Sequence, residues 1–151
     1  MTAVVRAILV VAALSPLASC SFYLGEPRVP KNDLRATLAG AYEVPPTTSE
    51  GGGYFEAVYR PSTKVLEYRL ILQGLSGPIT MGYLQGPAAP DQNGPRVAPI
   101  NIPIYDYTIR DGVTLTEEQA AQVLAGQWYV NVMTLQYPDG EIRGQILPLR
   151  K

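Results

Sequence analysis

Turn-forming residues interrupt this chain so often that long helices are excluded over most of its length. The 151 residues include 14 Gly and 14 Pro, and both residue types disfavour helix interiors. Clusters at 51–53, 61–64 and 86–95 leave only short segments between them. Within these segments apolar and polar residues alternate, as in Leu34–Leu38 and Leu66–Leu72. Such alternation is typical of strands with one buried face.

Only residues 116–125 predict a helix. Thr116 can cap its start, Gln119 can complete a capping box, and Gly126 can end it. After it, Trp128, Val130 and Val132 alternate with Tyr129, Asn131 and Met133, which again predicts a strand with one buried face. Together with about seven or eight short strands, this helix predicts an all-β Greek-key sandwich or flattened barrel.

The N-terminal residues have the composition of an export signal. Arg6 precedes an apolar core, Ala7–Leu17, and small residues follow it. This core is too short to cross a bilayer, because a spanning helix needs about twenty residues. Leu17-Ala18-Ser19-Cys20 resembles a bacterial lipobox, in which cleavage leaves the cysteine as the first mature residue with acyl chains attached.

Three segments follow from this motif. We predict a signal peptide over 1–19, a lipidated Cys20 that begins a tether over 20–32, and a β domain over 33–151. Two or three acyl chains would hold the protein firmly at a membrane. Ser21 after the cysteine is typical of lipoproteins sent to the outer membrane, facing either the periplasm or the exterior.

The composition excludes several classes of chemistry. The chain has no histidine, which removes Ser–His and Cys–His catalysis and His-ligated zinc or copper. One cysteine cannot form an intramolecular disulfide. A formal net charge of −1, with 12 basic and 13 acidic residues, argues against nucleic-acid binding. No catalytic carboxylate pair is identifiable, so we predict neither an enzyme nor a cofactor.

Several segments in order resemble the CHRD domain, a module named from chordin and widespread in bacterial exported proteins. They are Leu38–Gly40, Glu43–Pro46, Gly74–Gly77, Gly86–Ala88, Asn93–Pro95, Leu115–Thr116, Leu124–Gly126, Tyr129–Val132 with Thr134, and Tyr137–Ile146. The last segment is the most specific part of the resemblance, which extends from about Leu34 to Leu147.

The chain departs from this family at three positions. CHRD members commonly carry a His-x-His pair before Gly-Pro-Ala and another histidine before the Thr of Asn-Val-x-Thr, and some have been suggested to bind copper. Tyr83, Gln85 and Met133 occupy these positions here. The resemblance therefore implies a variant without the family's metal ligands. Its three replacements could fill the core, form a recognition face, or, with Met81, leave a poor Cu(I) site.

Two further sets of residues have structural and functional interpretations. Glu43 and Arg143 could line a ligand pocket, but the interpretation we favour is structural: an ion pair, or hydrogen bonds, that pin a turn. Tyr105 and Tyr107 could form an aromatic strip, although tyrosine is common in sheets generally.

The predicted function is that of a noncatalytic, lipid-anchored envelope protein. Its CHRD-like domain would bind an unknown protein or glycan through loop 86–95 and the face of Tyr83, Gln85 and Met133. The alternative is a copper-handling protein with a degenerate site at Met81 and Met133.

Overall fold

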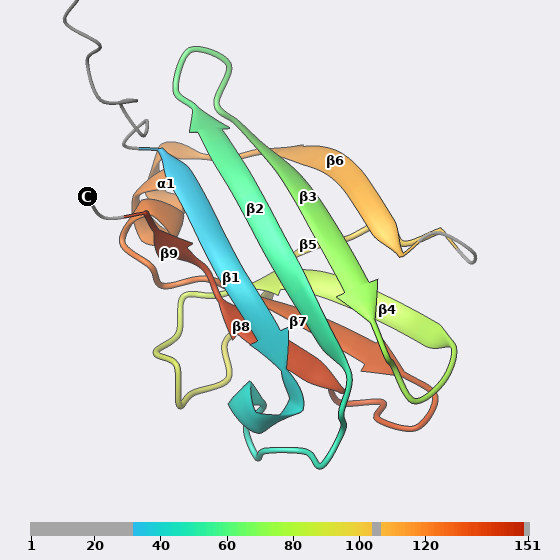
Figure 1. Cartoon of the computed structure of the whole chain (residues 1–151). Coiled ribbons are helices and arrows are strands. Elements are labelled where there is room, and N and C mark those ends of the chain that lie inside the picture. Colours follow the sequence, from blue (N-terminus) through green and yellow to red (C-terminus); the bar gives the residue numbers. More distant parts are fainter. Residues whose placement is uncertain (1–31, 104–106, 150–151) are drawn as a thin grey trace, which may run out of the picture.

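The computed structural model describes residues 32–103 and 107–149, and its elements are arranged as Figure 1 shows. In chain order they are β1 (Asp33–Ala39), the short 3-10 helix η1 (Gly40–Tyr42), β2 (Gly52–Arg60), β3 (Val65–Gln73), β4 (Ile79–Gln85), β5 (Arg96–Pro99), β6 (Thr108–Thr114), α1 (Glu117–Leu124), β7 (Tyr129–Thr134), β8 (Ile142–Gln145) and β9 (Leu147–Pro148). Cys20, the signal segment, the tether and Tyr105 lie outside the described residues.

The strands form one antiparallel sheet that folds back on itself. Its order is β5-β4-β7-β8-β1-β2-β3-β6, with β9 also paired to β1. Strand β1 is central, because β2 pairs along one side of it while β8 and β9 pair along the other. Strands β1, β2, β3 and β6 make one layer, and β4, β5, β7 and β8 cross behind it (Figure 1). The predicted all-β sandwich or flattened barrel is confirmed.

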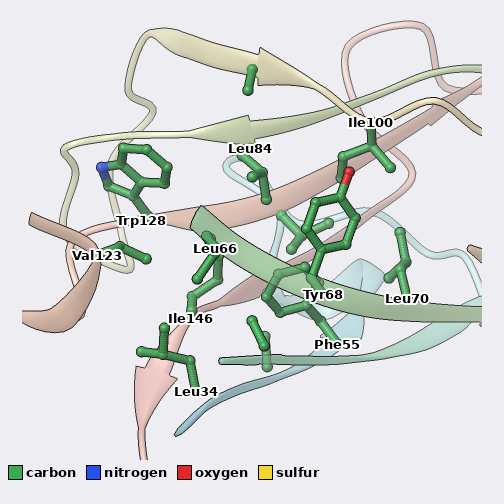
Figure 2. Close-up of a cluster of buried hydrophobic side chains, with 14 of the residues drawn as sticks. Leu34, Phe55, Leu66, Tyr68, Leu70, Leu84, Ile100, Val123, Trp128 and Ile146 are labelled. Carbon is green, nitrogen blue, oxygen red and sulfur yellow. The ribbon is translucent and has the colours of Figure 1, made fainter. Parts of the chain in front are cut away.

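The core fills the space between the two layers (Figure 2). Alternate residues of β1 and β3 enter it, as the sequence pattern predicts. Phe55 and Tyr68 stack there with ring centroids 5.4 Å apart. Burying a large apolar side chain of this kind contributes about 1.5–3 kcal/mol. Trp128 is fully buried, and its indole Nε1 donates to Gln122 Oε1 of α1 at 3.1 Å.

Helix α1 begins and ends where its sequence predicts. Thr116 accepts from the Gln119 backbone N–H and the Gln119 side chain accepts from the Thr116 N–H, which completes the capping box. Gly126 follows the helix at a φ of +77°, which glycine adopts without the Cβ strain of other residues. Ala120 and Val123 face the core.

Strand β7 differs from the expected half-buried strand, because all of its residues are buried. Val130 and Val132 face the core, as expected. Tyr129, Asn131 and Met133 project to the opposite face, yet each is no more than 4% exposed. Alternation in sequence identifies which face is apolar, but it does not report whether distant loops cover the polar face.

Removing the helix cap should destabilise the domain measurably. We expect Thr116→Ala to lower the free energy of unfolding by about 1 kcal/mol, because the Gln119 N–H loses its acceptor. Urea denaturation measures this difference. Thr48→Ala, in an exposed loop, is the matched control and should change the same free energy by less than about 0.5 kcal/mol.

Candidate functional site

A polar layer lies on the outer face of β4, β7 and β8, on the side opposite the core. Strand pairing sets Asn131 opposite Arg143, and sets Tyr129 opposite both Gln85 and Gln145. Side chains at paired positions project from the same face of a sheet. Gln85, Asn131 and Arg143 are each at most 5% exposed, so other segments must cover this layer.

Arg143 attaches loop 86–95 to the sheet. Its Nη1 donates to Asn93 Oδ1 at 3.1 Å, and its Nη2 donates to the carbonyls of Ala89 and Gln92 at 3.2 and 2.8 Å. The guanidinium lies 3.6 Å from the ring centroid of Tyr129, a cation–π contact. One side chain therefore fixes three points of the loop.

Neighbouring side chains close the same loop further. Tyr129 donates its hydroxyl hydrogen to Gln85 Oε1 at 2.5 Å and accepts from the Gly94 N–H at 2.9 Å. Gln145 Nε2 donates to the Ala88 carbonyl at 3.1 Å. Asn93 Nδ2 donates to the Val44 carbonyl at 2.8 Å, which links the loop to the turn after η1. The two covering segments are thus held to the sheet and to each other.

Burial lowers the pKa of Arg143, while the nearby Tyr129, Glu43 and Asp91 act to raise it. A guanidinium stays protonated under these conditions. Arg143 is only 1% exposed. Its positive charge is therefore removed from water and is balanced by the carbonyl dipoles of the loop and the ring face of Tyr129. Within the described ranges, three ion pairs join Arg35 to Glu56, Arg60 to Glu67 and Lys64 to Glu117, and none of them includes Arg143.

Glu43 lies directly after η1 and is only 5% exposed. Burial raises the pKa of its carboxyl to about 7, although Arg143 and the Val44 N–H both act to lower it. Arg143 thus acts on Glu43 through charge, but the two residues are not among the ion pairs of the described chain. The structure brings the two predicted residues together in one buried region without the direct contact that an ion pair requires.

Glu141 is a buried carboxyl with a different environment. Ser49, Ser76 and Thr134 donate their hydroxyl hydrogens to it at 2.6, 2.8 and 2.5 Å, and the Ser76 N–H donates at 2.7 Å. Burial acts to raise its pKa, but these donors outweigh burial and lower it. Glu141 therefore serves as a charged acceptor that ties two loops to the end of β7.

A groove with a volume of about 900 Å³ runs between the turn at 41–46, the tip of loop 86–95 and the outer face of β1, β8 and β9. Its lining residues are Arg35, Ala36, Thr37, Ala41, Tyr42, Glu43, Val44, Pro46, Tyr54, Pro90, Asp91, Arg143, Gln145, Leu147, Pro148 and Leu149. Tyr42 and Leu147 are each 54% exposed. We refer to this feature as the β1 groove.

The predicted recognition face is only partly accessible. Met81 is half-exposed and Tyr83 is partly exposed, with the Tyr83 hydroxyl donating to Met81 Sδ at 3.1 Å and Arg96 over the Tyr83 ring at 4.5 Å. Gln85 and Met133 are buried. A ligand could reach Met81 and Tyr83, but not the other two without rearrangement.

The strand register separates these positions. Met81 lies opposite Met133, Tyr83 opposite Asn131, and Gln85 opposite Tyr129. They share one face of the sheet, but Gln85 lies four residues along the strands from Met133, or roughly 13 Å. Across the described ranges, no three Asp, Glu, His or Cys side chains gather as a metal ion would require. Nor does the described part contain a helix long and apolar enough to cross a membrane.

The protein is thus a small β domain in which a loop covers a buried polar layer of the sheet, beside an open groove. A family model for the CHRD domain matches residues 34–146, and the chain belongs to the CHRD domain family. This family is a binding type of domain, not a catalytic one. No curated protein and no solved structure matches the chain significantly.

Replacing Arg143 should loosen loop 86–95. We expect Arg143→Lys to lower the free energy of unfolding by about 2–3 kcal/mol, because an ammonium cannot reach three acceptors in one plane while stacking on Tyr129. Urea denaturation gives the free energy, and amide hydrogen exchange in the loop should accelerate. Arg69→Lys, on an exposed position of β3, is the control and should leave both quantities nearly unchanged.

Glu141 should contribute stability that is lost in acid. Its folded pKa lies below the ordinary value, so the contribution is present above the unfolded pKa and disappears as the pH falls through the folded pKa. We expect Glu141→Gln to lower the free energy of unfolding at pH 7 by about 1–3 kcal/mol. The variant should also lose less of its remaining stability than the unmodified protein does as the pH is lowered. Glu50→Gln, at an exposed position, is the control. If Glu141→Gln lost as much stability in acid as the unmodified protein, this assignment would be contradicted.

Proposed function

We propose that the protein is a noncatalytic, lipid-anchored protein of the bacterial outer membrane whose CHRD domain binds a neutral oligosaccharide in the β1 groove. The lipobox ending at Cys20 supports the anchor. One observation supports the binding site above all others: the groove is open, while both of its loop walls are held in place by hydrogen bonds from Arg143 and Asn93. Pre-organised walls reduce the entropy that a ligand must overcome.

The dimensions of the groove suit a small ligand. Ligand pockets commonly measure about 300–1,000 Å³ and combine apolar walls with a few polar groups. Here Pro46, Pro90 and Leu147 provide apolar walls, whereas Thr37 and Arg35 provide hydrogen-bonding groups. A volume of about 900 Å³ is consistent with a few sugar rings or a short peptide.

Hydrogen bonding favours the sugar over the peptide. An extended peptide commonly binds by adding a strand to an open sheet edge. Strand β1, which forms the floor, is already paired on both sides, so recognition here must use side chains. Arg35 can donate to hydroxyl groups, and Asp91 can accept from them, at several angles.

The aromatic residues and the charge balance favour the same ligand. Tyr42 and Tyr54 offer flat ring faces with a polar tip, onto which the apolar face of a sugar can pack. The lining contains two cations, Arg35 and Arg143, and two anions, Glu43 and Asp91. These charges cancel when Glu43 is ionised and leave one net positive charge when it is protonated, so the groove attracts a strongly charged partner only weakly.

Copper handling remains the alternative function. The observation that favours it is the register of β4 and β7, which sets Met81 directly opposite Met133. Thioethers favour Cu(I), although the burial of Met133 limits access to it. Cu(I) titration of the purified protein decides between the two functions: micromolar or tighter binding that Met133→Leu abolishes would favour copper handling and overturn the oligosaccharide proposal.

The anchor can be tested by intact mass. Protein purified from its native membrane should begin at Cys20 and carry the mass of a diacylglyceryl group and an additional acyl chain. Cys20→Ser should leave the precursor uncleaved and unacylated. A native mass without lipid would overturn the proposed anchoring.

Oligosaccharide binding can be tested by calorimetry on the mature protein in detergent micelles, with oligomers of N-acetylglucosamine as probes. We expect Tyr42→Ala to weaken binding roughly fivefold, because one stacked ring contributes about 1 kcal/mol. Tyr107→Ala is the matched control, since Tyr107 is similarly exposed at 49% but does not line the groove. Equal effects of the two variants, or no saturable binding by the probe, would count against the proposal.

A further inference from the structure

Three buried side-chain oxygen atoms of the described residues have no hydrogen-bond donor: Glu43 Oε1, Asn131 Oδ1 and Gln145 Oε1. Glu43 lines the β1 groove, Asn131 lies outside its lining, and both side chains are at least 95% buried. The Glu43 and Asn131 oxygens converge on Gly140, where a Cβ would lie 2.6 Å from the glutamate oxygen and 2.7 Å from the asparagine oxygen. Both oxygens therefore border the space that a side chain at position 140 would occupy.

An ionised Glu43 would be unfavourable in this position. A carboxylate accepts hydrogen bonds only, as does an amide oxygen, so the two atoms would face each other without a donor between them. Buried acceptors without a donor destabilise the folded state. A protonated carboxyl has one O–H to donate, and one proton would satisfy both oxygens.

We propose that Glu43 and Asn131 form a proton-binding site in which the protonated carboxyl donates to Asn131 Oδ1, and that loss of this proton alters the wall of the β1 groove. The first half of this proposal stands on the two side chains alone. The second half rests on the groove being the ligand site.

Arg143 acts on this proton through its charge, which favours loss of the proton, and not through an ion pair with the carboxyl. Arg143 of β8 is the one cation that acts on Glu43 among its described neighbours, and its Nη atoms donate to Asn93, Ala89 and Gln92 instead. From loop 86–95, Asp91 acts on Arg143. In the turn before β8, the Asp139 carbonyl accepts from Asn131 Nδ2 at 3.5 Å, while the Glu141 carboxylate is bound by Ser49, Ser76 and Thr134.

The site is directly connected to the groove wall. The Glu43 N–H donates to the Gly40 carbonyl at 3.1 Å, which closes η1. The next residue, Val44, accepts from Asn93 at the opposite wall. The preceding residue, Tyr42, is the exposed ring of the groove. Ionisation of Glu43 would therefore displace the segment that carries Tyr42 and weaken ligand binding.

The titration itself is the first test. Burial raises the pKa of Glu43 to about 7 from the ordinary 4.5, so the ¹³C chemical shift of its carboxyl should titrate near pH 7 in the mature protein. A Glu43 midpoint at or below 4.5 would overturn the proposal.

Stability gives an independent test with a defined sign. Between pH 4.5 and about 7 the folded state holds a proton that the unfolded state has lost, so the stability falls as the pH rises through this range and levels off above it. We expect Glu43→Gln to remove this decline, because the Gln Nε2 can donate to Asn131 at every pH. The urea midpoint of this variant at pH 8 should be at or above that of the unmodified protein.

The same variant distinguishes a shared proton from a cation or a water molecule bound between the two oxygens. If a cation or a water molecule joined the two oxygens, the carboxylate would be the favoured form, and Glu43→Gln would lower the urea midpoint at pH 8. That result would overturn the proposal.

Ligand affinity tests the regulatory half. For oligomers of N-acetylglucosamine, the dissociation constant should rise several-fold between pH 6 and pH 8 in the unmodified protein and stay constant in Glu43→Gln. A constant value in both proteins would overturn the control of the groove. Failure of the probe to bind at all would instead count against the proposed ligand, because the chemical-shift titration contains no ligand.

Discussion

The burial of one guanidinium determines how the second face of the sheet is covered. Arg143 projects away from the apolar core and is removed from water, so each of its hydrogen bonds must be made within the protein. Loop 86–95 supplies the acceptors and Tyr129 supplies the ring face. As a consequence, β7 becomes a strand buried on both sides, and the domain has a polar inner layer in addition to its apolar core.

Two buried glutamates show how local donors decide the state of a carboxyl. Glu141 receives four hydrogen bonds and has a lowered pKa. Glu43 has one oxygen without any donor, and its pKa is raised to about 7. Both residues are at most 5% exposed, so burial alone does not distinguish them. The number of donors does, and it assigns a structural anchor to one residue and a titratable site to the other.

The sequence predicted the strands and the helix better than it predicted the contacts between distant segments. Alternation identified the strands, and the capping residues identified the limits of α1, because both are local properties of the chain. The polar layer was not predictable, since it depends on Arg143 reaching loop 86–95 across more than fifty positions. Asn131 and Tyr129 were identified only as the polar side of a strand, and Gln85 and Met133 gave no local sign that they would be buried. For Tyr129, Asn131 and Met133, the alternate positions of β7 were the only available signal.

The position of β1 has a mechanical consequence. This strand begins at Asp33 and pairs with β2 along its whole length on one side, and with β8 and β9 at Leu34, Arg35 and Ala39 on the other. A pulling force applied at Asp33 along the strand is therefore shared by many hydrogen bonds at once, in shear, and does not open them one after another. A domain attached through its central strand in this way resists extension far better than one attached through an edge strand that can be peeled away.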